Sequence, residues 1–281
     1  MPIIIFTDLD GTLLNHYDYS YEAALPSLKR IKETGIPLII TTSKTRSEVE
    51  FLQRKIGIID PFIVENGSGI FIPNSSSLKN IKSGEKQGDY TLIRLGKSYE
   101  NIRPLFGEIA SRFVIKGFGD LTIAEIAALT GLSEMEAGRA RLREFTEPFL
   151  VENNADISGI EKYAFSMGLK VTKGGRFYHL IGIGQDKGAA VKKIIDIYRD
   201  NLKPAMFASV GIGDSENDLP MLEQVDIPVL IPKPHSRYQD FALPGLVRAE
   251  EPGSRGWNSA VESILNRIDK KSFLSKEVMR H

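Results

Sequence analysis

The chain has 281 residues, enough for two domains with sizeable cores, and 42% of them are hydrophobic. Lysine plus arginine equals aspartate plus glutamate at 36 each, so the charge balance indicates neither nucleic acid nor an anionic membrane as a partner. Cysteine is absent, which excludes disulfides, thiolate zinc sites and a cysteine nucleophile. No apolar stretch approaches the roughly 18–20 residues that span a bilayer. We expect a cytoplasmic protein that is a monomer or a small homo-oligomer.

The first quarter of the chain alternates strands with helices. Short β-branched runs closed by turns predict buried strands, and apolar residues at helical spacing predict the helices between them. The expected elements are a strand over 3–7, a helix over 21–35, a strand over 36–43, a helix over 45–57 and a strand over 61–73 that runs into a Gly-rich turn. This order predicts a parallel sheet with helices on its faces.

The middle of the chain loses this rhythm. Residues 74–89 are polar and turn-rich, and indicate a hairpin or a boundary. The pattern beyond them predicts strands over 90–95 and 145–151, helices near 98–112, 122–129, 133–144 and 156–167, and a hairpin over 169–182 that turns at Gly174 and Gly175.

The strand–helix rhythm returns after Gly184. Here the pattern predicts helices over 187–200, 217–224 and 257–268, and strands over 205–213 and 227–232. We therefore predict an α/β fold with a doubly wound, Rossmann-like parallel-sheet core. The core would comprise residues 1–87 and 185–281, and an inserted α+β cap domain would comprise residues 88–184.

Four predicted strands end in polar side chains. These are Asp8 with Asp10, Thr42 with Ser43, Glu65 with Asn66, and Asp214 with Asp218, while Lys187 opens the helix that returns to the core. Ligands of open parallel sheets bind beyond the carboxyl ends of the strands, so we expect these groups to gather in one crevice. Clustered carboxylates repel one another unless a cation neutralises them, and an all-oxygen set suits Mg²⁺. The sequence thus predicts a site that Mg²⁺ and a phosphate share.

The residue types suggest a role for each group. Asp8 is the expected nucleophile, since a carboxylate that attacks phosphorus forms an aspartyl-phosphate and splits one hard hydrolysis into two easier steps. Asp10 lies on the same side of an extended segment, where it would protonate the leaving alkoxide and deprotonate the attacking water. Thr42 and Lys187 would stabilise charge on the phosphoryl oxygens, and Asp214 would complete the metal shell. Each residue alone also fits a turn, a helix cap or a surface position; the prediction rests on their conjunction.

Four short motifs, DLDGTLL, TTSKT, DKG and GDSENDLPML, together resemble those of the haloacid dehalogenase-like phosphatases. The middle resembles the α/β cap of the sugar-phosphatase branch, which includes sucrose-phosphatase and phosphomannomutase, and VENG at 64–67 is typical of that branch. The resemblance implies that Asp8 is the nucleophile, Asp10 the acid and base, and Lys187 the phosphate clamp. It also implies that Asp8, Asp10 and Asp214 bind Mg²⁺, together with the backbone carbonyl of the residue at Asp10.

Two stretches of the predicted cap bear on the substrate. KGGRFYHLIG carries Arg176 and His179, and RLREFTEPF carries Arg143 and Glu147. A guanidinium grips a carboxylate bidentately, and a glutamate suits sugar hydroxyls, so a compound that carries phosphate, carboxylate and sugar would use the whole set. With TSKT and GWNSAV at 256–261, these stretches resemble the mannosyl-3-phosphoglycerate phosphatase family, whose members make the compatible solute mannosylglycerate. The resemblance implies that the substrate is a small phosphorylated sugar-glycerate. The predicted substrate-binding residues are Thr12, Ser43, Lys44, Asn66, Arg143, Glu147, Arg176, His179, Asn217 and Asp218.

Three alternatives stay open at this point. One epimeric hydroxyl separates mannosyl from glucosyl-3-phosphoglycerate, and another sugar-phosphate phosphatase of the same fold would share the core motifs. A phosphomutase would share the aspartyl-phosphate. A phosphate-binding module without activity is disfavoured because both Asp8 and Asp10 are present, and a sensor can lose either of them.

Overall fold

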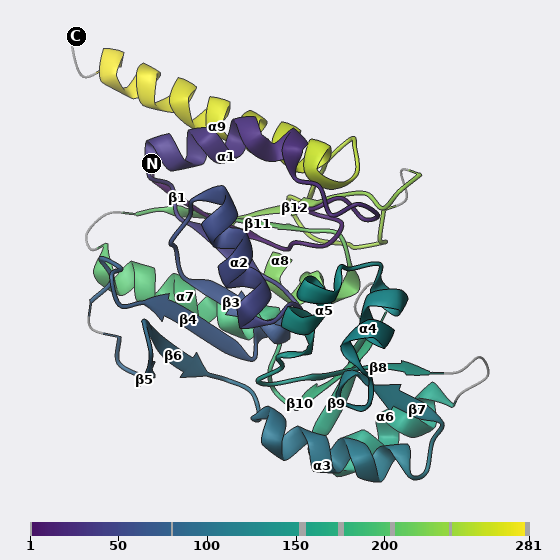
Figure 1. Ribbon diagram of the computed structural model, residues 1–281. Helices are drawn as coiled ribbons and strands as arrows, with labels where there is room; N and C mark the ends of the chain where they lie inside the picture. Colours follow the sequence, from purple (N-terminus) through teal and green to yellow (C-terminus); the bar gives the residue numbers. More distant parts are fainter. Residues whose placement is uncertain are drawn as a thin grey trace. The chain divides into compact units, whose positions relative to one another are not determined.

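We analysed a computed structural model of the chain, which describes residues 2–79, 81–151, 156–173, 177–202, 206–235 and 238–278 (Figure 1). The chain forms two compact units, Met1–Ile39 with Ile194–His281 (the first unit) and Ile40–Lys193 (the second unit). The predicted turn at Gly174 and Gly175 and the predicted substrate-binding residue Arg176 lie outside the described residues.

Parallel strands form the sheet of the first unit, in the order β13-β12-β11-β1. Its elements are β1 (Ile3–Thr7), η1 (Glu22–Ala24), α1 (Leu25–Thr34), β11 (Ala208–Gly213), η4 (Glu216–Asp218), α8 (Leu219–Leu222), β12 (Ile227–Leu230), β13 (Val247–Arg248) and α9 (Gly253–Val278). Every residue of β1 and β11 is buried, as the continuous apolar runs predict for strands covered on both faces. The sequence analysis missed the two-residue strand β13 and placed the start of α9 four residues too late.

Helix α9 is tied to both α1 and the end of β1. The Ser27 hydroxyl of α1 donates to the Asn258 side chain at 2.8 Å. Trp257 is wholly buried, and its indole nitrogen donates to the Thr7 hydroxyl at 2.9 Å. The GWNSAV stretch therefore fixes the last residue of β1, next to Asp8.

The second unit contains a mixed sheet in the order β2-β3-β4-β6-β5, in which β2 and β3 are parallel and the other pairs antiparallel. These elements are β2 (Leu38–Thr41), which starts in the first unit, α2 (Arg46–Ile56), β3 (Phe62–Val64), η2 (Glu65–Gly67), β4 (Gly69–Pro73), β5 (Glu85–Gln87) and β6 (Tyr90–Arg94). The polar stretch 74–89 leads into a hairpin of β5 with β6.

The stretch 61–73, predicted as a strand that runs into a Gly-rich turn, forms two antiparallel strands, β3 and β4, with a turn between them. The chain reverses at Glu65, Asn66 and Gly67, whose φ angles of 49°, 59° and 90° all lie in the left-handed region. Asn and Gly tolerate this region better than other residues, and a Cβ on Gly67 would overlap the backbone oxygen of Asp186. Strand periodicity alone does not show such a reversal.

A four-stranded antiparallel sheet, in the order β7-β8-β10-β9, makes up the rest of the second unit. Its elements are α3 (Tyr99–Ala110), β7 (Ile115–Gly117), η3 (Phe118–Asp120), α4 (Ile123–Thr130), α5 (Glu134–Arg141), β8 (Glu147–Val151), α6 (Ile157–Ser166), β9 (Leu169–Lys173), β10 (Tyr178–Gly182) and α7 (Lys187–Asn201), which ends in the first unit. Helices α3 and α6 cover this sheet through an apolar core that includes Phe106, Ile160 and Leu180 (Figure 1).

Helix α5 ends at Arg141, three residues before the predicted end, because residues 144–146 bond to Glu65 instead of continuing the helix. The predicted α/β class, with a helix-covered parallel sheet and an α+β middle, is confirmed. The boundaries predicted for the inserted domain, 88 and 184, stay a prediction. Among the helices that the structure describes, none is long and apolar enough to cross a membrane.

Candidate active site

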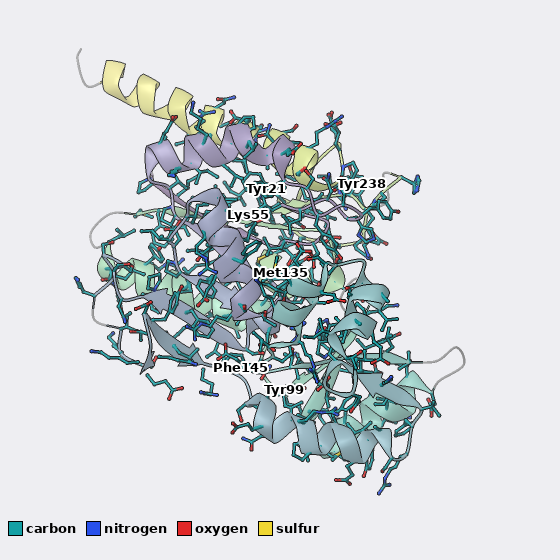
Figure 2. All side chains as sticks on the ribbon, viewed as in Figure 1. Tyr21, Lys55, Tyr99, Met135, Phe145 and Tyr238 are labelled. Carbon is teal, nitrogen blue, oxygen red and sulfur yellow. The ribbon has the colours of Figure 1, made fainter. Side chains whose placement is uncertain are left out.

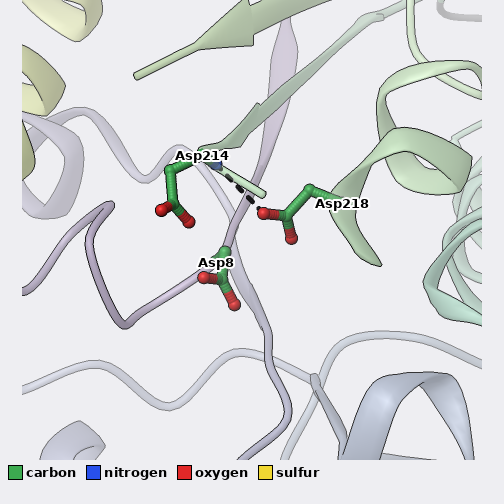
Figure 3. Close-up of side chains that lie close together, drawn as sticks. All are labelled: Asp8, Asp214 and Asp218. Carbon is green, nitrogen blue, oxygen red and sulfur yellow. Dashed lines mark hydrogen bonds between the residues drawn. The ribbon is translucent and has the colours of Figure 1, made fainter. Parts of the chain in front are cut away.

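Three carboxylates converge in the first unit where its two central strands end. Asp8 follows β1 and Asp214 follows β11, and the parallel pairing of Thr7 with Ile212 brings both residues out at the same sheet edge. Asp218 comes from the short helix η4. The three side chains are 6%, 3% and 0% exposed, and ligand oxygens of all three lie within 4.8 Å of one another (Figure 3).

Hydrogen bonds shape the loop that carries Asp214. The Asp218 Oδ2 accepts the backbone N–H of Asp214 at 3.0 Å (Figure 3). It also accepts the backbone N–H of Ser215 at 3.0 Å, and the Ser215 hydroxyl donates to Asp214 Oδ1 at 2.8 Å. The predicted residue Thr12 approaches the same Oδ1 with its hydroxyl, at 3.5 Å. Gly11 has a φ of 81°, and a Cβ there would lie 2.7 Å from Asp214 Oδ2. The glycine of DLDGT therefore makes room for the carboxylate.

This donor set fits a magnesium ion. Three buried like charges repel each other unless a cation lies among them, and carboxylate oxygens are the ligands that Mg²⁺ prefers. Asp10 is partly exposed and is not one of these three residues, so its predicted part in metal binding stays a prediction. Asp218, predicted to bind substrate, lies instead with the metal candidates. Asn217, also in η4, is half-buried.

The predicted residues Thr42, Ser43 and Lys44 form a loop that follows β2 in the second unit; it is called the predicted phosphate loop below. Thr42 is wholly buried, and its hydroxyl accepts the backbone N–H of Lys44 at 3.2 Å. The Lys44 ammonium pairs with Glu48 at 3.4 Å, at the start of α2. The backbone N–H groups of Glu65 and Asn66 donate to the carbonyls of Lys44 and Thr42, at 3.1 and 2.9 Å. The turn after β3 thus supports the loop after β2.

Lys187 opens α7 beside this turn. Its side chain is 1% exposed, and the preceding Asp186 backbone packs so closely on Gly67 that no Cβ fits between them. The structure therefore brings Thr42, Asn66 and Lys187 into one region of the second unit. This agrees with the expectation that polar groups beyond the carboxyl ends of the strands gather together.

Two predicted substrate-binding residues lie buried near Lys187. The Arg143 side chain is 6% exposed; one terminal nitrogen donates to the Ser43 carbonyl at 2.8 Å, and its Nε has no hydrogen-bond partner among the described residues. Burial lowers the pKa of His179 to about 3, and the charges of Arg143 and Lys187 act in the same direction. Its Nδ1 also has no partner in the described part of the chain. A buried, cation-rich cluster with unsatisfied nitrogens suits an anionic ligand.

Glu147 is engaged by the protein itself. One carboxylate oxygen accepts the Gly119 N–H at 2.9 Å, and the other accepts the Tyr99 hydroxyl at 2.6 Å. Tyr99 lies at the start of α3 (Figure 2). Burial raises the pKa of Glu147, and the bond from Tyr99 opposes that rise. Its predicted contact with sugar hydroxyls stays a prediction.

The chain matches a family model described as haloacid dehalogenase-like hydrolase over residues 5–242. The chain belongs to the haloacid dehalogenase-like hydrolase family. A Persephonella marina protein named glucosyl-3-phosphoglycerate/mannosyl-3-phosphoglycerate phosphatase is 51% identical, over 95% of this chain and 99% of its own length. A Pyrococcus furiosus protein named mannosyl-3-phosphoglycerate phosphatase is 37% identical, over 81% of this chain and 90% of its own.

Solved structures agree with this family at the level of the fold. A Thermoplasma acidophilum crystal structure aligns with a TM-score of 0.68 and 20% identity, over 94% of this chain and 98% of that one. A Synechocystis sucrose-phosphatase, solved with sucrose and phosphate, aligns with a TM-score of 0.61 and 15% identity, over 94% and 98%.

For one buried residue, Glu65, no role was predicted from the sequence. Glu65 was noted at a strand end but was not included among the site residues. Its carboxylate is wholly buried and accepts hydrogen bonds from three successive backbone N–H groups and one hydroxyl. Two sequence signals pointed to it: it directly follows a buried strand, where a turn residue gives the same signal, and it belongs to the VENG stretch at 64–67.

Proposed function

We propose that this chain is a Mg²⁺-dependent phosphatase that releases phosphate from mannosyl-3-phosphoglycerate, giving mannosylglycerate, and that also accepts the glucosyl compound. The observation that carries the proposal is the buried cluster of Asp8, Asp214 and Asp218 at the strand ends. The names of relatives as similar as 51% over 95% of the chain support the choice of substrate. The free phosphoryl group and the glycerate carboxylate give that substrate two anionic ends for the protein to hold.

The chemistry follows from the residues at the sheet edge. A carboxylate oxygen of Asp8 attacks phosphorus as the bond to the glycerate oxygen breaks, and Asp10 gives its proton to the departing alkoxide. Asp10 then takes a proton from water as the water oxygen attacks the aspartyl-phosphate, which frees phosphate and restores Asp8. Magnesium held by the cluster would neutralise negative charge on the transferring phosphoryl group.

Other residues serve binding in this proposal. Thr42 and Lys187 hold the phosphoryl oxygens, as the family resemblance implies. Arg143 and His179 hold the glycerate carboxylate, because Arg143 Nε and His179 Nδ1 are buried and have no hydrogen-bond partner among the described residues. Burial keeps His179 neutral at physiological pH, so it donates a hydrogen bond without adding a charge. Arg176 stays a candidate for the same carboxylate.

The test is a substrate panel with the purified chain in Mg²⁺. We expect kcat/KM for mannosyl- and glucosyl-3-phosphoglycerate to exceed that for glucose 6-phosphate, mannose 1-phosphate and 3-phosphoglycerate by about a hundredfold, the scale of one charged contact that only the full substrate completes. Equal rates across the panel would contradict the proposed substrate. No phosphate release from any member, or from p-nitrophenyl phosphate, would contradict the phosphatase.

A further inference from the structure

Glu65 lies where three segments of the second unit meet. Its own backbone N–H donates to the Lys44 carbonyl at 3.1 Å, which ties the turn after β3 to the predicted phosphate loop. Its side chain is bonded to a different segment, residues 144–146, which directly precede β8. One residue therefore contacts both the loop after β2 and the segment that follows Arg143.

The carboxylate of Glu65 is fully occupied as an acceptor. The Glu144 N–H donates to one oxygen at 2.8 Å, and the N–H groups of Phe145 and Thr146 donate to the other at 3.2 and 2.8 Å. The Thr146 hydroxyl adds a fourth bond at 2.8 Å. Burial raises the pKa of Glu65, while Arg143, the N–H groups of Glu144 and Phe145 and the Thr146 hydroxyl act to lower it. The four hydrogen bonds to the Glu65 carboxylate hold residues 144–146 in place.

The segment held in this way carries Arg143. The Arg143 guanidinium lies 3.8 Å from the Glu65 carboxylate and donates to the Ser43 carbonyl at 2.8 Å. A second tie runs in parallel, from the Thr45 hydroxyl to the Arg139 carbonyl at 2.9 Å. The ring of Phe145, one of the residues bonded to Glu65, fills the space that a side chain at Gly69 would need. Arg143 is therefore held at two points. The residue that follows it, Glu144, is bonded to Glu65 through its backbone, and the Arg143 side chain is bonded to the loop after β2.

We propose that Glu65 is a positioning residue for substrate selection, which holds residues 144–146 so that Arg143 presents its guanidinium to the glycerate carboxylate. This inference rests on the proposed function, because it needs a substrate with that carboxylate. Glu65 itself touches no substrate. Its loss should therefore weaken binding of the sugar phosphoglycerate and leave the chemistry at Asp8 intact.

A double-mutant cycle between Glu65 and Arg143 tests this coupling. Glu65→Gln keeps the shape but places an amide N–H₂ against backbone donors, and we expect kcat/KM for mannosyl-3-phosphoglycerate to fall by about a hundredfold, mainly through KM. Arg143→Met should cause a similar loss, and the double variant should be no worse than Arg143→Met alone. The rate on p-nitrophenyl phosphate should change less than about threefold with Glu65→Gln, since that substrate has no carboxylate.

A matched pair at Thr146 keeps the test decisive if Glu65→Gln does not fold. Thr146→Val keeps the volume but loses the hydroxyl that bonds Glu65, whereas Thr146→Ser keeps the hydroxyl and leaves a small cavity. We expect Thr146→Val to lose about tenfold in kcat/KM on the sugar phosphoglycerate and Thr146→Ser to stay near wild type. Melting temperatures of both variants show whether the loss follows the hydroxyl or the stability of the fold.

The outcomes separate the two proposals. If the wild-type chain does not hydrolyse the sugar phosphoglycerates, the proposed function is wrong. If the wild type is active but the losses of Glu65→Gln and Arg143→Met multiply, the inference about Glu65 is overturned and the function stands. Parallel losses on p-nitrophenyl phosphate, or a Thr146→Ser variant as impaired as Thr146→Val, would also overturn it.

Discussion

The two units present clusters of opposite charge that are built in different ways. The acidic cluster of the first unit comes from residues that directly follow β1 and β11 and from one short helix beside them. The cationic cluster of the second unit draws Arg143, His179 and Lys187 from three separate segments, and Glu65 and Ser43 fix its arginine. The difference suggests a division of work, in which the acidic cluster carries the chemistry with Lys187, and Arg143 and His179 select the substrate.

The largest effect should come from Asp8→Asn. The amide does not attack phosphorus, so turnover should fall by at least about a thousandfold on every phosphomonoester, including p-nitrophenyl phosphate. Circular dichroism should show an unchanged fold. Glu33→Gln, on the exposed side of α1, is the control and should keep wild-type activity. A variant with more than about a thousandth of the wild-type rate would show that Asp8 is not the nucleophile.

Metal removal should have the next largest effect and should involve the acidic cluster alone. EDTA should abolish activity, added Mg²⁺ should restore it, and saturating Mg²⁺ should raise the melting temperature by roughly 5–10 °C, since a ligand at a hundred times its Kd stabilises by about 2.7 kcal/mol. Asp214→Asn should lose most of this shift, and Arg143→Met should keep it. Activity that survives EDTA treatment and does not respond to Mg²⁺ would contradict the assignment of a required metal to the acidic cluster.

The same contrast explains which features of the site could be predicted from the sequence and which could not. Asp8 and Asp214 were predictable because each follows a recognisable strand, and parallel neighbours bring strand ends to one edge. Arg143 was predictable as a candidate from its residue type, but its bond to the Ser43 carbonyl joins residues a hundred positions apart. The early end of α5 could not be predicted either, because the acceptor that competes for residues 144–146 is Glu65, on a distant turn.

The strand pattern had a limit of the same kind. The Gly-rich turn after the strand that starts at 61 was predictable, but the second strand beyond it, antiparallel to the first, depends on left-handed φ angles that Asn66 and Gly67 merely permit. The carboxylate of Asp218 lies with those of Asp8 and Asp214, and its predicted contact with substrate stays a prediction.

A smaller effect should appear in the pH dependence of stability, and it concerns the cationic cluster alone. The pKa of His179 falls from an ordinary 6.5 to about 3 in the folded chain, so between these values the unfolded chain binds a proton that the folded chain does not. The free energy of unfolding should therefore fall as the pH drops from 6.5, by up to about 1.4 kcal/mol per pH unit. Above pH 6.5, His179 is neutral in both the folded and the unfolded chain, so it adds no pH dependence to the free energy of unfolding there.

His179→Gln should remove that slope. Denaturant unfolding at several pH values between 4 and 7 measures it, and the difference between variant and wild type cancels the opposite effects of Glu65 and Glu147, whose pKa values are raised by burial. A difference that does not change with pH would show that His179 titrates normally and is not buried among cations.

The most direct test of the division between the clusters is the ratio of two rates in one variant. We predict that Arg143→Met lowers kcat/KM for mannosyl-3-phosphoglycerate by about a hundredfold and changes that for p-nitrophenyl phosphate by less than about threefold, because only the first substrate has a carboxylate. Arg141→Met, two residues earlier and exposed, should match the wild type on both. Equal losses on the two substrates with Arg143→Met would contradict the account, since Arg143 would then serve the fold or the phosphate.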